Sequence, residues 1–453
     1  MYCFLPKICR LKSAFVFLAF SCSGNSQPTF RYIEIPNTNG RSLQASAISG
    51  DGLTVVGTIL RGDLPFPSGF NYVPFSWTAI SGFNYLSHPD ITSGFSSVEV
   101  RGISQNGQRI VGRGPISRTN PRHVAILWSN DSRGQLGDGL LGAAAISNDG
   151  NFVVGYGELP LTTFQQAYRR STSGEVIGLG RLSYPMSYAD GISGDGNVVV
   201  GACWSSTLVN NSYYETVLEA FRWTSATGML SIANVPGSVG SSVATDASYD
   251  GSVVVGGMPR SNGKMQASRW KPQDGMVGLG VVSGDSESRA YAVSDDGRIV
   301  VGNSSIGTSW DKQNAFIWTE ESGMRKLEDF MRDEYGIITG PLHFAEDISP
   351  DGRSIVGHTN FHGPSFVWVI NDVNLQTSSF VFKTKRIEVI DYDVHVTITS
   401  QASKAYQLET NTNLVSGWVP IGDPVVATGT QTTLIHLSGA RSPRRFYRAR
   451  QIE

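Results

Sequence analysis

The residues whose type and spacing most suggest chemistry are the aspartates of a recurring S-x-D-G turn. Calcium loops place oxygen ligands at alternating positions over about twelve residues. In this chain only one acidic residue per turn is regular, and one turn has Asn106 in its place. We therefore expect each aspartate to bond the backbone of its own turn. No metal and no other cofactor is predicted.

The histidines and cysteines show no catalytic pattern either. His358 and His362 are four residues apart, but glycines flank them, which favours a surface loop over a zinc-binding helix. Cys203 has no histidine near it in the sequence that could activate it as a nucleophile. No residue is predicted to be catalytic.

Aromatic side chains gather in the longest and most variable loops. Loops 58–73 and 202–218 carry most of them, and equivalent loops of later repeats carry the rest. Variable loops on a rigid scaffold are common binding sites, and exposed aromatic rings stack on sugars or anchor protein partners. The alternative is that each ring simply covers the end of the scaffold. The candidate ligand-binding residues are Phe66, Phe70, Tyr72, Trp204, Tyr213, Tyr214, Trp310 and Phe361.

These turns and loops belong to a repeated unit, A-x-x-I-S-x-D-G-x-x-V-V-G followed by A-F-x-W. The turn glycines are 55, 43, 46, 55, 46 and 55 residues apart, a period typical of an array of small units. Serine, Asp or Asn, and glycine in this order suit a tight turn whose glycine has a positive φ. The seven turn glycines are Gly52, Gly107, Gly150, Gly196, Gly251, Gly297 and Gly352.

The strand pattern of the unit predicts a seven-bladed β-propeller over residues 28–370. Each hairpin is followed by a strand ending in tryptophan and by a fourth short strand, and four antiparallel strands in under sixty residues are typical of a blade. The seventh unit lacks its fourth strand. We expect Phe30–Ile35 to supply it and to join the two ends of the ring, which would hide exposed strand edges.

One segment between the sixth and seventh units departs from the strand pattern. In Lys326–Tyr335 the residues Leu327, Phe330 and Met331 lie at helical spacing with charges between them, which predicts a short helix.

Both ends of the chain lie outside the array. Lys7, Arg10 and Lys12 precede the apolar run Ala14–Phe20, a pattern typical of an export signal, so residues 1–27 are predicted to be a signal peptide and short leader. A disordered native start is the alternative. The run is too short to span a bilayer. Residues 371–379 are predicted to be a linker, and alternating runs over 380–453 predict a small β-sandwich-like domain.

The composition argues against several classes of partner. Charged residues make up 16% of the 453 residues and the net charge is −2, whereas a nucleic-acid-binding domain usually carries a basic stripe. Hydrophobic residues make up 40%, so the 51 glycines fit a folded protein rich in turns. We expect a monomer with no transmembrane segment.

The repeated unit resembles the HAF family of predicted extracellular bacterial repeats, over roughly Phe30–Ile370. The Leu-Glu-Asp-Phe run at 327–330 is similar to that family's usual ending. The segment from Tyr406 to Arg448 is similar to a C-terminal β-module common on secreted bacterial proteins. These resemblances imply an exported protein, extracellular or in the cell envelope, and they supply no catalytic residue.

Two functions of different classes follow. The first is an exported, non-catalytic binding or scaffold protein that presents its aromatic loops to a glycan or a cell-surface protein. The alternative is a polysaccharide-acting lyase or hydrolase built on a propeller, because the fold does not determine the function. A convergent set of carboxylates, or of His, Tyr and Arg, at the mouth of the ring would favour the enzyme. The loops show no such regular set, which favours binding.

Overall fold

Two units make up the chain in the computed structural model. One comprises Gln27–Leu375, and the other comprises Met1–Ser26 together with Gln376–Glu453. The division after Leu375 falls within the predicted linker 371–379. The structure describes residues 15–18, 28–33, 42–61, 71–87, 98–117, 120–129, 132–160, 164–209, 213–233, 241–307, 313–359, 366–373, 384–399, 405–411, 419–429, 431–437 and 444–452.

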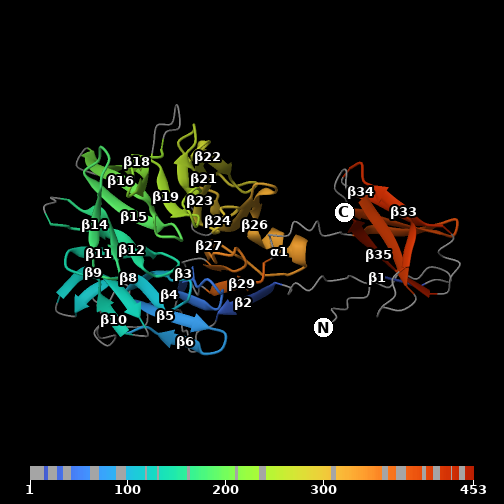
Figure 1. The fold of residues 1–453 in the computed structure, drawn as a ribbon, viewed down its shortest axis with the longest axis horizontal. Coiled ribbons are helices and arrows are strands. Elements are labelled where there is room, and N and C mark those ends of the chain that lie inside the picture. Colours follow the sequence, from blue (N-terminus) through green and yellow to red (C-terminus); the bar gives the residue numbers. More distant parts are fainter. Residues whose placement is uncertain are drawn as a thin grey trace. The chain divides into compact units, whose positions relative to one another are not determined.

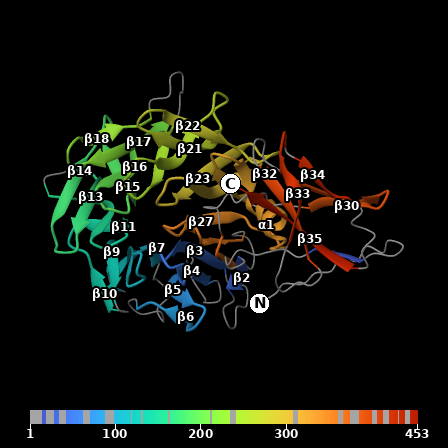
Figure 2. The same ribbon diagram turned by 45° about the vertical axis from the view of Figure 1, so that its right-hand side comes forward.

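The described residues of the larger unit form seven four-stranded antiparallel sheets, one for each copy of the repeat (Figure 1). The first strands, which lie towards the middle of the ring in Figure 2, are β3 (Ser42–Ile48), β7 (Glu99–Ile103), β11 (Leu140–Ile146), β15 (Met186–Ile192), β19 (Val243–Ala247), β23 (Glu287–Val293) and β27 (Phe344–Ile348). The second strands are β4 (Thr54–Arg61), β8 (Arg109–Ser117), β12 (Phe152–Gly157), β16 (Val198–Val209), β20 (Val254–Pro259), β24 (Ile299–Ser305) and β28 (Ile355–His358).

The third and fourth strands extend each sheet outwards. The third strands are β5 (Asn71–Thr78), β9 (Asn120–Ser129), β13 (Gln166–Ser171), β17 (Tyr213–Thr224), β21 (Met265–Lys271), β25 (Gln313–Thr319) and β29 (Val367–Asn371). The outer strands are β6 (Gly82–Tyr85), β10 (Ser132–Gln135), β14 (Val176–Gly180), β18 (Gly228–Ser231), β22 (Gly275–Gly280), β26 (Gly323–Lys326) and, for the seventh sheet, β2 (Thr29–Ile33).

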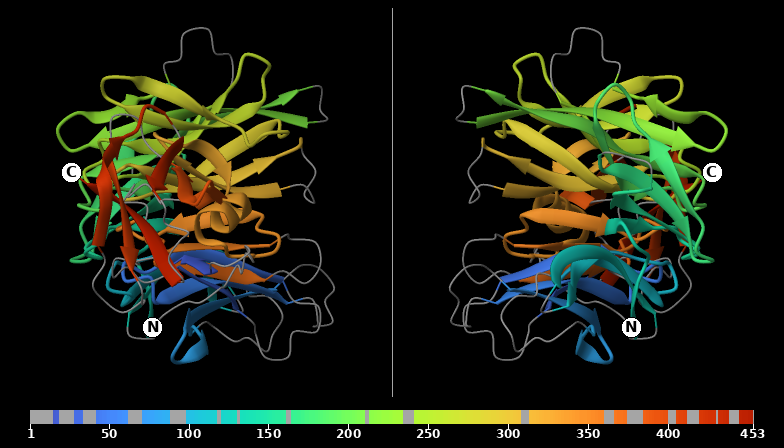
Figure 3. Two further views of the ribbon diagram at one scale, coloured as in Figure 1. Left: turned by 90° about the vertical axis from the view of Figure 1, so that its right-hand side faces the viewer. Right: turned by 90° about the vertical axis from the view of Figure 1, so that its left-hand side faces the viewer.

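The sheets form a closed ring. Each first strand contacts the first strand of the next sheet, and β27 contacts β3. The N-terminal strand β2 pairs antiparallel with β29, with Phe30 opposite Ile370 and Ile33 opposite Val367. Side views accordingly show the blue start of the array beside its orange end (Figure 3). The predicted β-propeller is confirmed, and so is its closure by an N-terminal strand.

The S-x-D-G turns hold the first hairpin of every sheet. In the first turn Asp51 Oδ1 accepts hydrogen bonds from Ser49 Oγ at 2.6 Å and from the backbone N–H of Leu53 at 2.9 Å. Ser49 Oγ in turn accepts from Thr54 N at 2.9 Å, and Gly52 has φ 70°. Equivalent bonds recur in the other six turns. The prediction that each acidic residue bonds its own turn is therefore confirmed.

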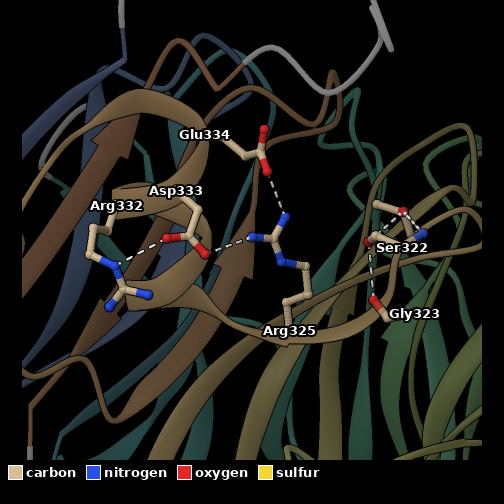
Figure 4. Close-up of polar contacts among 7 residues, drawn as sticks. Ser322, Gly323, Arg325, Arg332, Asp333 and Glu334 are labelled. Atoms are coloured by element: carbon tan, nitrogen blue, oxygen red, sulfur yellow. Dashed lines mark hydrogen bonds and ion pairs between the residues drawn. The ribbon is translucent and has the colours of Figure 1, made fainter. Parts of the chain in front are cut away.

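The helix α1 (Leu327–Tyr335) lies between β26 and β27, as predicted. Its buried residues are Leu327, Phe330 and Met331, which share a core cluster with the sixth and seventh sheets. Arg325 at the end of β26 donates to Glu334 Oε1 at 2.8 Å and to Asp333 Oδ2 at 3.3 Å (Figure 4). Part of the charged face therefore anchors the helix.

In the smaller unit, the residues that the structure describes form two sheets around one core. One has the order β30 (Thr384–Ile390), β31 (Asp393–Thr399), β34 (Gln431–His436), and the other the order β1 (Phe15–Leu18), β35 (Arg444–Ile452), β32 (Ala405–Asn411), β33 (Val419–Val426). Val396, Leu408 and Tyr447 belong to the shared core. This arrangement agrees with the predicted sandwich-like domain.

Strand β1 belongs to the predicted signal segment and pairs in parallel with β35. The rest of residues 1–27 lies outside the described residues, so the signal peptide stays a prediction. In the described part of the chain, no helix has the length and apolar character needed to cross a membrane.

Candidate ligand-binding cavity

Every first strand carries a β-bulge at the same place, the first x of A-x-x-I-S. In the fourth sheet, Ala189 pairs with Gly201 and Gly191 pairs with Val200, so Asp190 is the extra residue between them. A bulge of this kind re-aims a side chain. The seven extra residues are Ser46, Arg101, Ala144, Asp190, Thr245, Tyr291 and Glu346.

The glycine that ends each V-V-G run makes room for the bulge. A Cβ on Gly201 would overlap the backbone oxygen of Tyr188, two residues before Asp190, and would also press on the ring of Phe221. The same overlap with the first strand occurs at all seven equivalent positions, Gly57, Gly112, Gly155, Gly201, Gly256, Gly302 and Gly357. The two parts of the repeat therefore act together to turn one residue per sheet inwards.

A cavity of about 180 Å³ lies in the middle of the ring, lined by residues of all seven sheets. All seven bulge residues are part of its lining. At roughly 30 Å³ per water molecule, the space holds about six waters. It therefore suits a small ligand or the end group of a larger one.

The end of the cavity formed by the S-x-D-G turns is crossed by a side-chain bridge. Asn148 Nδ2 donates to the two carboxylate oxygens of Asp295 at 3.2 and 2.9 Å. These residues come from the third and sixth sheets, which lie across the ring from each other. Backbone bonds tie neighbouring turns together, for example Gly50 N to Gln105 O at 2.9 Å. This end is therefore narrowed by the scaffold itself.

The opposite end faces the loops that connect one sheet to the next. Arg101 Nη2 donates at 2.7 Å to Oε2 of Glu99, the first residue of β7. The Arg101 side chain is 52% exposed. Glu99 also accepts two bonds from Arg113, at 3.1 and 2.8 Å. Arg101 is thus paired in a charged network at the solvent-facing end.

Three of the five carboxylates that line the cavity are held by the scaffold. Asp295 is bonded to Asn148, as above. Asp246 Oδ2 accepts from Val293 N and Asp347 Oδ2 accepts from Ile48 N, each at 2.9 Å. Val293 and Ile48 belong to the following sheets, so these two aspartates link neighbouring sheets across their free inner edges.

Asp190, Tyr291 and Glu346 are different, because none of the three makes a side-chain hydrogen bond to any described residue. Burial raises the pKa of Asp190 to about 7 and that of Glu346 to about 8, and the charge of Arg101 opposes both shifts. Burial, together with the negative charge of Glu346, also raises the pKa of Tyr291. The three side chains are part-buried and face the cavity, and ionisable groups with shifted pKa values in a cavity mark candidate functional sites.

His358 lies beside Glu346, with Nδ1 3.7 Å from Glu346 Oε1. Its side chain is 2% exposed and stacks on Phe344. Burial and the nearby His343 lower the pKa of His358 to about 3, so it is neutral at physiological pH. The predicted surface loop is wrong for His358, which ends the buried strand β28; His362 lies outside the described residues.

The predicted aromatic site is only partly described. Phe66, Phe70, Trp310 and Phe361 lie outside the described residues. Tyr72 on β5 and Trp204 on β16 are half-buried, and neither lines the cavity. Tyr213 and Tyr214 begin β17, opposite Val209 and Leu208.

The segment 202–218 is not the long loop that the sequence suggested. β16 and β17 stay paired from Val198–Thr224 to Val209–Tyr213, so the segment is a β-hairpin that extends the fourth sheet. The reason is that both arms are rich in β-branched and aromatic residues, which favour strands over open loops.

Comparisons with known proteins bear on the fold alone. No protein-family model and no curated protein matches the chain. The chain is similar to the β-propeller domain of the Trilobed protease from Pyrococcus furiosus, with a TM-score of 0.47 and 10% identity over 74% of this chain and 94% of that one. It is also similar to TolB from Acinetobacter baumannii (TM-score 0.41, 14% identity, 61% of this chain and 63% of that one).

A further similar structure is oligogalacturonate lyase from Vibrio parahaemolyticus, with a TM-score of 0.43 and 10% identity over 76% of this chain and 97% of that one.

The described residues contain no group of three or more His, Cys, Asp or Glu side chains that could hold a metal ion.

The raised pKa values of Asp190 and Glu346 predict that the stability of the protein depends on pH. Their pKa values in the folded protein lie above those of an unfolded chain, about 3.9 for Asp and 4.3 for Glu. The folded state therefore holds protons that the unfolded state releases, and stability is lost as pH rises from about 4 to about 8. We expect D190N/E346Q to be more stable than wild type by about 2 kcal/mol at pH 8, a value reduced for screening by cavity water.

Urea unfolding at pH 4 and pH 8 measures this effect. The difference between the two proteins should disappear at pH 4, and the exposed-turn variant Glu321→Gln should match wild type at both values. Equal stability of D190N/E346Q and wild type at pH 8 would contradict the prediction.

Proposed function

We propose that this protein is an exported, non-catalytic binding propeller that takes an end group of its ligand into the central cavity from the loop end. The observation that carries the proposal is the set of Asp190, Tyr291 and Glu346, three polar side chains from three sheets that line one cavity and make no side-chain hydrogen bond to a described residue. All three side chains are part-buried, so they are open to a ligand in the cavity. A hydrogen bond between a ligand and a charged side chain contributes about 1.5–3 kcal/mol.

The aromatic residues of the loop end would contact the remainder of the ligand. Trp204, Tyr213 and Tyr214 belong to the extended β16–β17 hairpin, and such residues commonly dominate binding to glycans or protein partners. Export is supported by the pattern at 1–27 and by the resemblance to extracellular repeats. A glycan or a cell-surface protein remains the proposed class of partner.

A glycan array followed by calorimetry on the best ligand tests this function. Relative to wild type, D190N/E346Q should lose at least about tenfold in affinity while its melting temperature does not fall, because about 1.4 kcal/mol of lost bonding is tenfold. The variant with Trp204, Tyr213 and Tyr214 all changed to alanine should also lose binding, and Glu321→Gln should bind like wild type. Unchanged affinity in D190N/E346Q would exclude the cavity as the site.

A polysaccharide-acting enzyme is the second candidate, and one observation favours it. The cavity brings carboxylates, a tyrosine and Arg101 together, which is the kind of set that an acid–base mechanism needs. The pKa values of Asp190 and Glu346, about 7 and about 8, also suit proton transfer near neutral pH. Incubation with plant and bacterial polysaccharides, followed by detection of new reducing ends and unsaturated products, tests it. Turnover by wild type but not by Glu346→Gln would replace the binding proposal.

A further inference from the structure

We infer that the group which enters the cavity is a protonated primary amine, held between Asp190, Tyr291 and Glu346. The inference rests on the proposed function, since it names the chemistry recognised by the same cavity. A primary ammonium group has three N–H donors and no acceptor. The cavity offers it three oxygen-bearing side chains from the fourth, sixth and seventh sheets, none of them bonded to another described residue.

The charges around the cavity favour a cation over an anion. Among the described residues that line the space, five are carboxylates and Arg101 is the one lysine or arginine. Its guanidinium is already bonded to Glu99. An anion would therefore meet carboxylates without a free positive partner. A neutral hydroxyl group would bond the same oxygens but would gain no charge attraction when the carboxylates lose their protons.

The size of the space sets how much of the ligand can enter. About 180 Å³ accommodates an ammonium group with a few carbon atoms, because the same volume corresponds to about six waters. The bridge between Asn148 and Asp295 crosses the turn end, so the rest of a longer ligand would extend towards the loops. A short aliphatic amine and the amine of an amino sugar both meet these conditions.

The ionisable groups of the cavity predict that binding is linked to proton release. The charged or ionisable groups near Asp190 are Arg101 and Tyr188. Those near Glu346 are Arg101, Asp347, Tyr291 and the neutral His358. The remaining ionisable residues described in the lining are Asp246 and Asp295. With pKa values of about 7 and about 8, Asp190 and Glu346 hold protons through much of the neutral range. An entering ammonium ion would displace them. Affinity should therefore rise with pH from about 6 to about 8.

Isothermal titration calorimetry with paired small molecules tests the inference. Butylamine is compared with butanol, and glucosamine is compared with N-acetylglucosamine, so that each amine has a neutral partner of similar shape. We expect the wild-type protein to bind at least one amine ten times more tightly than its partner. The affinity for butylamine, whose amine stays protonated over this pH range, should rise up to about tenfold per pH unit for each proton released. Buffers with different ionisation heats report that release directly.

Variants separate this inference from the proposed function. Asp190→Asn and Glu346→Gln should each weaken amine binding about tenfold and reduce its pH dependence, whereas Glu321→Gln should change neither. Equal binding of amine and neutral partner, independent of pH, would overturn the amine inference and leave the cavity as a binding site. Equally tight binding of calcium ion, added as calcium chloride, and of the amine would also overturn the inference and would favour a metal cation as the ligand. If neither Asp190→Asn nor Glu346→Gln changed the affinity, the inference and the proposed function would both be overturned.

Discussion

Gly201→Ala is expected to destabilise the propeller by about 3–5 kcal/mol, because the new methyl group would overlap the backbone of the bulged strand. The backbone of Gly201 needs no unusual φ, so the effect would be steric. Relief requires that β15 move away from β16, which would break pairing at the bulge and withdraw Asp190 from the cavity. Urea unfolding monitored by tryptophan fluorescence measures the loss.

The matched control is Gly134→Ala on the outer strand β10. There the nearest atom to an added Cβ is the backbone oxygen of Leu127 at 3.9 Å, an ordinary contact. We expect this variant to unfold within about 0.5 kcal/mol of wild type. If Gly201→Ala behaved like Gly134→Ala, the bulge would not depend on the glycine, and the explanation given for the V-V-G run would be wrong.

Deletion of residues 28–36 is expected to destabilise the ring by about 3–6 kcal/mol. The deletion removes the outer strand of the seventh sheet, including the buried Ile33 and the hydrogen bond from Tyr32 Oη to Thr339 O at 2.7 Å. Losing a buried isoleucine costs about 2–5 kcal/mol, and each hydrogen bond contributes about 1 kcal/mol. The deletion also exposes the edge of β29.

Thermal unfolding of the deleted protein measures the effect, and a synthetic peptide of residues 28–36 provides the control. The peptide should raise the lowered midpoint in a concentration-dependent way, because it binds only the folded ring. The exposed-residue variant Arg31→Ala should unfold like wild type. An unchanged midpoint after the deletion would mean that the strand adds nothing to closure.

The scaffold was predictable because its determinants are local and repeated. The Ser and Asp of each turn bond atoms two to five residues away, so seven copies show the hairpin without any tertiary information. The strand β2 was also predictable, because the seventh unit visibly lacks a fourth strand. The helix α1 follows from the helical spacing of Leu327, Phe330 and Met331.

The cavity residues were missed, although a signal for them is present. In A-x-x-I-S the flanking Ala and Ile positions stay apolar, while the first x is Arg, Asp, Tyr or Glu in four of the seven repeats. Simple alternation along a strand would place that residue between sheets. Only the bulge, which depends on pairing with a second strand, turns it inwards. The variation in loop length pointed instead to the loops.

The predictions of a surface loop at His358 and of a long loop at 202–218 were wrong for a related reason. The glycines around His358 suggested a loop, but the third strand that buries it comes later in the chain. The length of 202–218 also suggested a loop, whereas the pairing between its two halves becomes visible only when both arms are aligned.

The bulge separates two kinds of information in each repeat. The turn, the apolar positions and the V-V-G run specify the ring. The single bulge residue of each repeat, the first x of A-x-x-I-S, specifies that repeat's part of the cavity lining. Read in order around this protein, the letters of these residues are S, R, A, D, T, Y and E. Duplication, loss or point mutation of one repeat could therefore change what the cavity accepts without disturbing its architecture. Any sequence built on the same unit can be read in this way, one letter per repeat, before its structure is known.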